Sequence, residues 1–364
     1  MIRNLPNACA VLAAVSLLAS PAAGSGLPEV HEKSDQVIEA RDLRELVVEN
    51  ARGFVQLRPS PDGRLHLTAW KSSRAQSRER AEEMSRQTIV HAAREGNRYR
   101  VRVEYPRRID VRIDFWDLFK GRTWDSNHMP RAEVRMVAEV PKGLVVRVTT
   151  ASGDIESQGL AAAQELTTAS GDVSLQDLTG ALVVQTASGD VSAKGITRLT
   201  VRTASGDVEV EQASGPLNSL TTSGDVTVDG VTDSVRAESS SGDLVVTEAP
   251  KGIIALSTSG EIVVRSAAGR IQLESSSGDV HCGLRAPLAG ADIGSLSGEV
   301  VVEFAPGVGA ALDLRTASGT LECAIPVRLK ESNRRGMVGE VGRGGSAVHL
   351  HTASGDITVT GGGQ

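Results

Sequence analysis

The chain repeats one short turn motif, Ser-Gly followed in most copies by an acidic residue, at nearly constant spacing. One intact copy is TASGD at residues 168–172, and TTSGD and SSSGD are variants. The motif glycines are Gly153, Gly171, Gly189, Gly206, Gly224, Gly242, Gly260, Gly278, Gly298, Gly319 and Gly355. Most neighbouring pairs are one constant period apart, and a fixed period of this kind identifies a repeat protein.

Apolar and other residues alternate on both sides of each glycine, as in LVVQTASGDVSA at residues 182–193. This period of two predicts two short strands joined by a tight turn. The repeat is too short for a four-stranded propeller blade, and leucine-rich-repeat spacing is missing. We therefore predict an all-β fold, a single parallel β-solenoid (β-helix) with about 18 residues per coil. The general preference of parallel crossovers predicts a right-handed coil.

Stacked coils place equivalent residues in columns, so the motif has a structural interpretation. The hydroxyl three residues before each glycine can bond from coil to coil, the glycine can adopt a positive φ, and the acid can accept turn N–H groups. The predicted structural turn residues of three central repeats are Ser170, Gly171, Asp172, Ser188, Gly189, Asp190, Ser205, Gly206 and Asp207.

A column of carboxylates about 5 Å apart costs free energy unless turn amides or a cation compensate for it. Calcium binding between coils is the alternative to turn capping. The metal candidates would be Asp172, Asp190, Asp207, Asp225 and Asp243. Calcium-binding repeats carry a Gly-x-Asp turn twice in each coil, which this chain lacks. Turn capping is therefore favoured, and no metal or cofactor is assigned.

Residues 1–24 have the pattern of a signal peptide. Arg3 precedes an apolar run over residues 8–18, and small residues follow near Ala22 and Gly24. No other segment has an apolar run long enough to span a bilayer, so the mature chain is expected to lack a transmembrane segment. We expect an exported protein, either periplasmic or secreted and associated with the cell envelope.

Residues 25–148 are predicted to form irregular coils of the same solenoid. Leu46, Val48, Asn50, Gly53 and Val55 occupy the phases of the later coils. Charged helix formers predict a short helix at 77–87. The regular repeats span 149–360, with a glycine- and arginine-rich loop at 328–345 and a flexible tail at 361–364.

An insertion at 106–130 concentrates aromatic residues in a chain that has only 2% of them. The interaction candidates are Phe115, Trp116, Phe119 and Trp124. They could form a cap over an open solenoid end, or an exposed loop that recognises a partner or a membrane surface.

No residue is assigned a catalytic role, because eleven equivalent serines cannot each have a histidine partner. His349 and His351 point outward on one strand without a third metal ligand. Cys282 and Cys323 are predicted to point inward, with the coil of Val302 between them. They would be too far apart for a disulfide and would remain two free, buried thiols.

The net negative charge of the repeat region argues against nucleic acid as a partner. Residues 149–324 carry 23 acidic and 9 basic side chains. Such an acidic surface does not bind nucleic acid.

The segments GFVQL, VAEVPKGLVVRVTTASGDI and GRGGSAVHLHTASGDITV, with the TASGDV repeats, resemble the bacterial "putative adhesin" family. This family is a domain of unknown function with β-strand repeats, in exported or envelope-associated proteins. The resemblance implies no catalytic residues. The preferred hypothesis is a non-enzymatic, adhesin-like envelope scaffold or binding protein, with an envelope protein or a surface ligand as partner. The alternatives are a polysaccharide lyase or hydrolase on a β-helix and a calcium-stabilised repeat protein.

Overall fold

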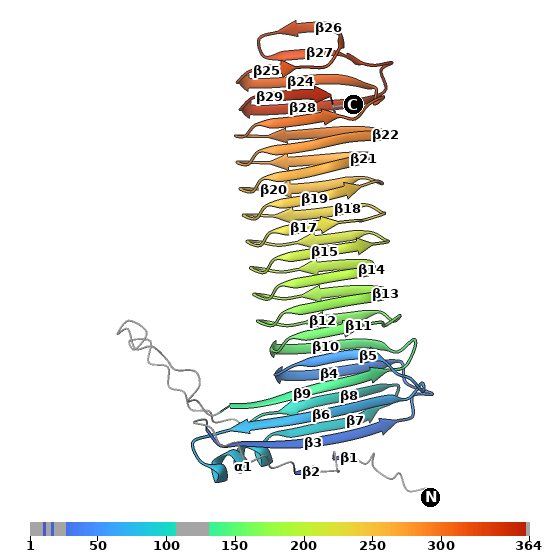
Figure 1. Cartoon of the computed structure of the whole chain (residues 1–364), viewed down its shortest axis with the longest axis vertical. Helices are drawn as coiled ribbons and strands as arrows, with labels where there is room; N and C mark the ends of the chain where they lie inside the picture. The colour runs from blue at the N-terminus through green and yellow to red at the C-terminus, as the bar shows by residue number, and fades with distance from the viewer. Residues whose placement is uncertain (1–9, 12–15, 18–26, 107–130, 362–364) are drawn as a thin grey trace, which may run out of the picture. The chain divides into compact units, whose positions relative to one another are not determined.

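The computed structural model describes residues 10–11, 16–17, 27–106 and 131–361 (Figure 1). The described residues are mainly β-strand with one α-helix, which confirms the predicted all-β class. The chain divides into two compact units, Met1–Gly171 and Asp172–Gln364. Each unit is described by itself.

The first unit contains twelve described strands and the helix. They are β1 (Ala10–Val11), β2 (Ser16–Leu17), β3 (Glu29–Ile38), β4 (Glu45–Arg52), β5 (Val55–Pro59), β6 (Leu65–Arg74), α1 (Arg78–Gln87), β7 (Ile89–Glu95), β8 (Arg98–Glu104), β9 (Arg131–Val140), β10 (Val145–Ser152), β11 (Ile155–Gln158) and β12 (Gln164–Thr167).

Parallel pairing in this unit follows the predicted phases. β10 lies between β4 and β12, with Val146 opposite Leu46 and Thr150 opposite Asn50. β11 pairs in parallel with β5. The irregular N-terminal strands therefore share the register of the repeats, as the alternation predicted.

The rest of the unit mixes two kinds of pairing. β4 pairs in parallel with β8, and β5 in parallel with β9. β6 pairs antiparallel with both β3 and β9, and β7 pairs antiparallel with β8. The helix expected at 77–87 is α1, and the Ser77 side chain caps it by accepting a backbone N–H. At the other end, the Lys71 ammonium donates to the carbonyls of Ser85 at 3.3 Å and Thr88 at 3.2 Å. Lys71 also pairs with Glu32 at 2.6 Å, which ties the helix to the sheet.

The second unit contains strands β13 to β29. They are β13 (Val173–Gln185), β14 (Val191–Arg202), β15 (Val208–Ala213), β16 (Leu217–Leu220), β17 (Val226–Asp229), β18 (Val235–Ser239), β19 (Leu244–Ala249), β20 (Ile253–Ser257), β21 (Ile262–Ser275), β22 (Val280–Ser295), β23 (Val300–Phe304), β24 (Ala310–Ser318), β25 (Leu321–Cys323), β26 (Val327–Asn333), β27 (Gly336–Val341), β28 (Ser346–Ser354) and β29 (Ile357–Gly361).

Successive repeats of this unit pair in parallel. Val173 lies opposite Val191, Val191 opposite Val208, and Val208 opposite Val226, so each step along the column is one repeat of the motif. All four side chains are buried. Each apolar column therefore forms part of the core, and the polar residues between them face outward.

The motif glycines are required by a close approach and not by their φ angles. Gly171, Gly206 and Gly224 do not have positive φ, so that expectation was wrong. A Cβ at Gly206 would lie 1.9 Å from the carbonyl oxygen of Gly189, and a Cβ at Gly224 would lie 2.0 Å from that of Gly206. Adjacent turns stack more closely than any side chain permits.

The segment 328–345, expected to be a loop, contains a β-hairpin instead. β26 and β27 pair antiparallel, and β27 pairs antiparallel with β24. The many glycines and arginines suggested a loop. However, the edge of β24 offers unpaired backbone groups, and pairing with β27 satisfies them.

The last repeat in the sequence is not the last in space. β28 lies between β22 and β24, and β29 lies between β23 and β25 (Figure 1). Val348, for example, pairs with Ala291 on one side and Leu312 on the other.

Both cysteines are free, as predicted. Two residues, Val302 and Val359, separate Cys282 from Cys323 along their column, so the prediction of one intervening coil was wrong. Cys282 is buried, and burial raises the pKa of its thiol to about 12. Cys323 is only half-buried, because β25 lies in the last repeat of the stack, so its predicted burial was wrong.

Replacing Gly206 by Ala should destabilise the second unit by about 1–3 kcal/mol, because the new Cβ would overlap the Gly189 carbonyl. Chemical denaturation measures this change. Ala204→Ser, at an exposed position of the same turn, is the matched control and should change stability by less than about 0.5 kcal/mol. Equal stability of the two variants would contradict the stacking argument.

Replacing Lys71 by Met should lower the stability of the first unit by about 1.5–3 kcal/mol, because charged hydrogen bonds are lost and Glu32 keeps an unpaired charge. The Lys71 and Glu32 side chains are only 17% and 14% exposed. Thermal unfolding followed by the helical circular dichroism signal tests this. Lys142→Met, at an exposed position of the same unit, should leave the transition in place.

Candidate functional site

The hydroxyl of the repeat motif bridges two turns. The Ser275 Oγ accepts the Gly278 N–H at 2.9 Å and donates to the Gly260 carbonyl at 3.1 Å. Thr203 accepts the Gly206 N–H in the same way at 3.0 Å. These hydroxyls are buried in the corner of the stack, where they satisfy backbone groups.

The motif serines use mainly their backbone. The Ser170 N–H donates to the Ala151 carbonyl and the Ser205 N–H to the Ala187 carbonyl, each at 3.0 Å. The side chains of Ser170, Ser188 and Ser205 face solvent. All three serines lie in bends between strands.

The acidic column bonds to the next repeat. Asp172 Oδ1 accepts the Asp190 N–H at 3.0 Å, and Asp190 Oδ1 accepts the Asp207 N–H at 2.9 Å. Asp207 and Asp225 continue this pattern with Asp225 and Asp243. Among the described residues, no group of three or more His, Cys, Asp or Glu side chains is placed to hold a metal ion.

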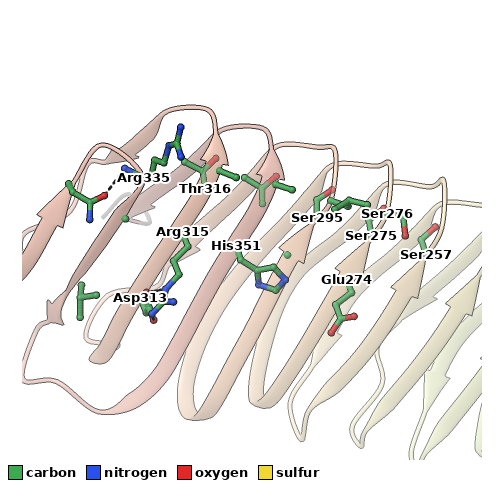
Figure 2. Close-up of a pocket in the computed structure, with 18 of the residues that line it drawn as sticks. Ser257, Glu274, Ser275, Ser276, Ser295, Asp313, Arg315, Thr316, Arg335 and His351 are labelled. Carbon is green, nitrogen blue, oxygen red and sulfur yellow. Dashed lines mark hydrogen bonds and ion pairs between the residues drawn. The ribbon is translucent and has the colours of Figure 1, made fainter.

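A groove of about 840 Å³ lies near the C-terminal end of the second unit (Figure 2). Its floor consists of outward-facing residues from five neighbouring strands, β20, β21, β22, β28 and β24. In that order the floor residues are Leu256, Glu274, Gly294, His351 and Arg315.

Two further sets of residues form the walls of this groove. Turn residues Ser276, Leu296, Ala317 and Ala353 form one side. Hairpin residues Glu331, Asn333, Arg335 and Val338 form the other. Leu296 is 59% exposed, so the groove presents apolar surface next to charged groups. The hairpin therefore converts an outward strand face into a recess.

Hydrogen bonds fix the shape of the groove. The Arg315 guanidinium donates twice to the Asp313 carboxylate, each bond 2.9 Å long. The Thr316 N–H donates to the Arg335 carbonyl at 3.0 Å, which anchors the hairpin turn to β24. A Cβ at Gly294 would meet the ring of His351 at 2.3 Å, so the imidazole lies directly over that glycine.

The charged groups of the groove are only partly paired. Among the described residues, the side chains of Arg335 and Glu331 have no ion-pair partner. His351 lies 3.6 Å from Asp292, while His349 lies 3.6 Å from a different carboxylate, Asp313. The two histidines therefore do not share a ligand site.

Beside the groove, Glu340 of β27 pairs with Lys330 at 2.6 Å and Arg328 at 3.5 Å. The Lys330 hydrogen bond holds the pKa of Glu340 below its usual value. These pairs join β26 to β27, so they stabilise the hairpin that forms one wall of the groove.

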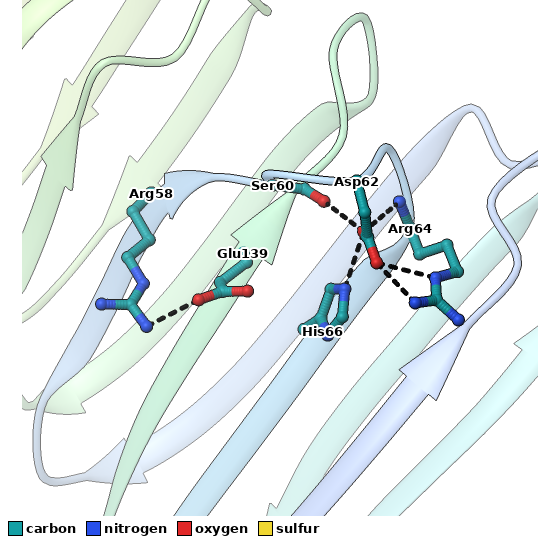
Figure 3. Close-up of polar contacts among 6 residues, drawn as sticks. All are labelled: Arg58, Ser60, Asp62, Arg64, His66 and Glu139. Atoms are coloured by element: carbon teal, nitrogen blue, oxygen red, sulfur yellow. Dashed lines mark hydrogen bonds and ion pairs between the residues drawn. The ribbon is translucent and has the colours of Figure 1, made fainter.

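A second polar cluster, in the first unit, organises a turn (Figure 3). The Asp62 carboxylate accepts bonds from the Ser60 hydroxyl and the Arg64 backbone and guanidinium, and it contacts His66 at 2.8 Å. The contact with His66, followed by the bonds from Arg64, lowers the pKa of Asp62. Both carboxylate oxygens are engaged, so this cluster shapes the turn between β5 and β6 and offers no free base.

The interaction candidates Phe115, Trp116, Phe119 and Trp124 lie outside the described residues, as does the remainder of the predicted insertion after 106. Their role stays a prediction. In the part of the chain that the structure describes, no helix is long and apolar enough to cross a lipid bilayer.

Sequence reasoning did not predict the groove, because its wall comes from the segment assigned as a loop. Two signals were available. The motif at Gly319 carries Thr320 in place of the acid, which marks this repeat as different. Alternating apolar residues at Met337 and Val341 also indicated a strand.

The model of a protein family described as Toastrack DUF4097 matches residues 43–247 and again 193–360. No curated protein matches this chain.

Three solved structures show a weak similarity to the fold of this chain. A putative cell adhesion protein from Clostridium sporogenes has 7% identity and a TM-score of 0.21, covering 91% of this chain and 100% of its own. A putative lipid binding protein from Parabacteroides distasonis has 12% identity and a TM-score of 0.33, covering 91% and 97%. A putative adhesin from Bacteroides fragilis has 8% identity and a TM-score of 0.24, covering 90% and 96%.

The acid of the last motif makes a pH-sensitive contact. Asp356 Oδ1 accepts the Thr320 N–H at 2.7 Å, and this bond lowers the pKa of Asp356 from its usual 3.8. The contribution to stability should be complete above about pH 4 and be lost as the pH falls through the lower folded pKa. Asp356→Asn does not titrate, so its difference from wild type in thermal midpoint should shrink between pH 6 and pH 2.5. A constant difference would contradict the role of this carboxylate.

Proposed function

Since the chain belongs to the Toastrack DUF4097 family, we propose that it is an exported, non-enzymatic binding or scaffold protein of the cell envelope. The proposed architecture is a right-handed parallel β-solenoid of about 18 residues per coil. Parallel pairing between strands that lie one repeat apart in the sequence supports that architecture. The signal-like residues 1–24 support export.

One observation supports a non-enzymatic role: the polar groups of the repeat motif form hydrogen bonds between neighbouring repeats. The buried hydroxyls bridge turns, and the carboxylates accept backbone N–H groups. A hydroxyl nucleophile needs an adjacent base, whereas the buried hydroxyl of Ser275 is already bonded to two turn backbone groups. The repeated chemistry therefore builds the scaffold, and recognition falls to the outward residues, which differ between repeats.

We assign partner binding to the groove beside the β26–β27 hairpin. Its apolar residues Leu256, Leu296 and Val338 lie beside the charged side chains of Glu274 and Arg335. The described lining has no aromatic platform on which a sugar ring could stack. Mixed apolar and charged groups suit a polypeptide that runs across the strands.

Site-specific photo-crosslinking in the native envelope tests this proposal. A photoreactive residue at Ala317 or Ser276, within the groove, should give the same discrete protein adduct. The same residue at Thr227, an exposed position on another strand face of the unit, is the control and should give none. Arg335→Glu should reduce the groove adduct at least severalfold, because it reverses a charge on the wall.

Two outcomes would overturn the proposal. One is an identical adduct pattern from all three positions, or no adduct from any of them. The other is turnover of an acidic polysaccharide by the purified chain that is lost in the Arg335 variant, which would favour the polysaccharide-acting alternative.

A further inference from the structure

The C-terminal repeat, residues 346–361, occupies a slot between two repeats that precede it in the chain. β28 and β29 lie against β22 and β23 on one side and against β24 and β25 on the other (Figure 1). We call this space the acceptor slot. The strands that form its two walls, β22 to β25, all come earlier in the chain than the segment that fills it.

Both faces of the C-terminal repeat use the common interactions of the stack. Thr352 donates its hydroxyl hydrogen to the Gly298 carbonyl, and Thr316 donates to the Gly355 carbonyl, each at 3.1 Å. A Cβ at Gly355 would lie 2.1 Å from the Gly298 oxygen. The slot therefore selects a glycine and a hydroxyl at fixed positions.

One contact of the acidic column favours insertion of this repeat over addition at the end. Asp279 Oδ1 accepts the Glu299 N–H at 2.8 Å, and Asp356 Oδ1 accepts the Thr320 N–H at 2.7 Å. Thr320 has no carboxylate with which to cap a following repeat. The repeat of β24 and β25 is therefore suited to the outer position, and an acid-bearing repeat is suited to the slot.

The C-terminal repeat is connected to the rest by a short glycine linker. Gly342, Gly344 and Gly345 have φ angles of +61°, +76° and +151°, and Arg343 between them is exposed. Within the slot, β28 and β29 pair only with β22, β23, β24 and β25. None of these pairings involves the linker. An identical segment from another chain would make the same contacts.

We propose that the acceptor slot is a self-recognition site, which takes the C-terminal repeat of a second copy of this chain in place of its own. Exchange in both directions joins two chains through their C-terminal repeats. His351, Thr352 and Ala353 of the same repeat line the groove. In the exchanged form, each chain therefore completes the groove of its partner.

Peptide exchange into the folded full chain tests the slot. A protease recognition sequence is inserted between Gly344 and Gly345, and the protein is cut after folding. A fluorescent peptide of residues 346–361 is then added. We expect it to be incorporated at one per chain, while mass spectrometry detects release of the resident segment.

A peptide with Gly355→Ala is the matched control. Its Cβ would overlap the Gly298 oxygen, so it should compete at least about tenfold more weakly than the unchanged peptide. Equal competition by both peptides would overturn the proposal. So would a cut protein that retains its own segment and admits no peptide.

The uncut chain provides an independent measurement. Deleting Gly344 and Gly345 should hinder insertion into the chain's own slot, so the variant should shift towards dimers in light scattering. Adding Gly355→Ala to the deletion should return it to monomers. A deletion variant that remains monomeric, with the Thr320 amide still protected from hydrogen exchange, would overturn the proposal.

Discussion

The contact between one glycine turn and the next is the constraint on which the repeats depend. With no Cβ at Gly206, its turn lies directly on the carbonyl of Gly189. This approach brings the buried hydroxyl of each repeat within reach of two turns, as Ser275 shows with Gly278 and Gly260. Once the turns are aligned, the strands on both sides follow in register. Equivalent valines are then stacked along the core, so the turns set the register and the individual core side chains do not have to.

This constraint also separates scaffold from function. The positions that repeat most faithfully are those that hydrogen-bond between turns, so their recurrence indicates stability rather than a multiplied active site. The outward positions of the strands make no such bonds between turns, so they can differ from repeat to repeat. The groove is an example of a surface formed by such differences. Gly294 makes room for the ring of His351, and Arg315 is held by Asp313. Distinct chemistry arises where the repeat pattern is locally broken.

The strand content, the apolar columns and the register of the N-terminal strands could be predicted because period-two alternation encodes them directly. The phase of Asn50 against Thr150 is one example. The helix at 77–87 was equally visible from its charged helix formers. The groove could not be predicted, since pairing of β27 with β24 depends on a free strand edge that only the assembled stack creates. The position of the C-terminal repeat was hidden for a related reason: alternation defines strands, but not the order in which equivalent strands stack. Only Thr320, by lacking a carboxylate, distinguishes the outer repeat from the others.

A stack of identical repeats has no intrinsic end, because each edge can pair with another strand. The chain solves this at its C-terminal side with two departures from the pattern. First, the acid is replaced at Thr320, so the outer repeat has no carboxylate with which to cap a successor. Second, the edge of β24 pairs with a hairpin of opposite direction, and the exposed strand β26 carries Arg328 and Lys330, charged residues that discourage further pairing. Because the C-terminal repeat is inserted within the stack, both Thr320 and the hairpin remain at the end of the stack. If that repeat were added last instead, Asp356 would be presented outward with its capping oxygen unused. The inserted order therefore satisfies more backbone groups and closes the edge at the same time.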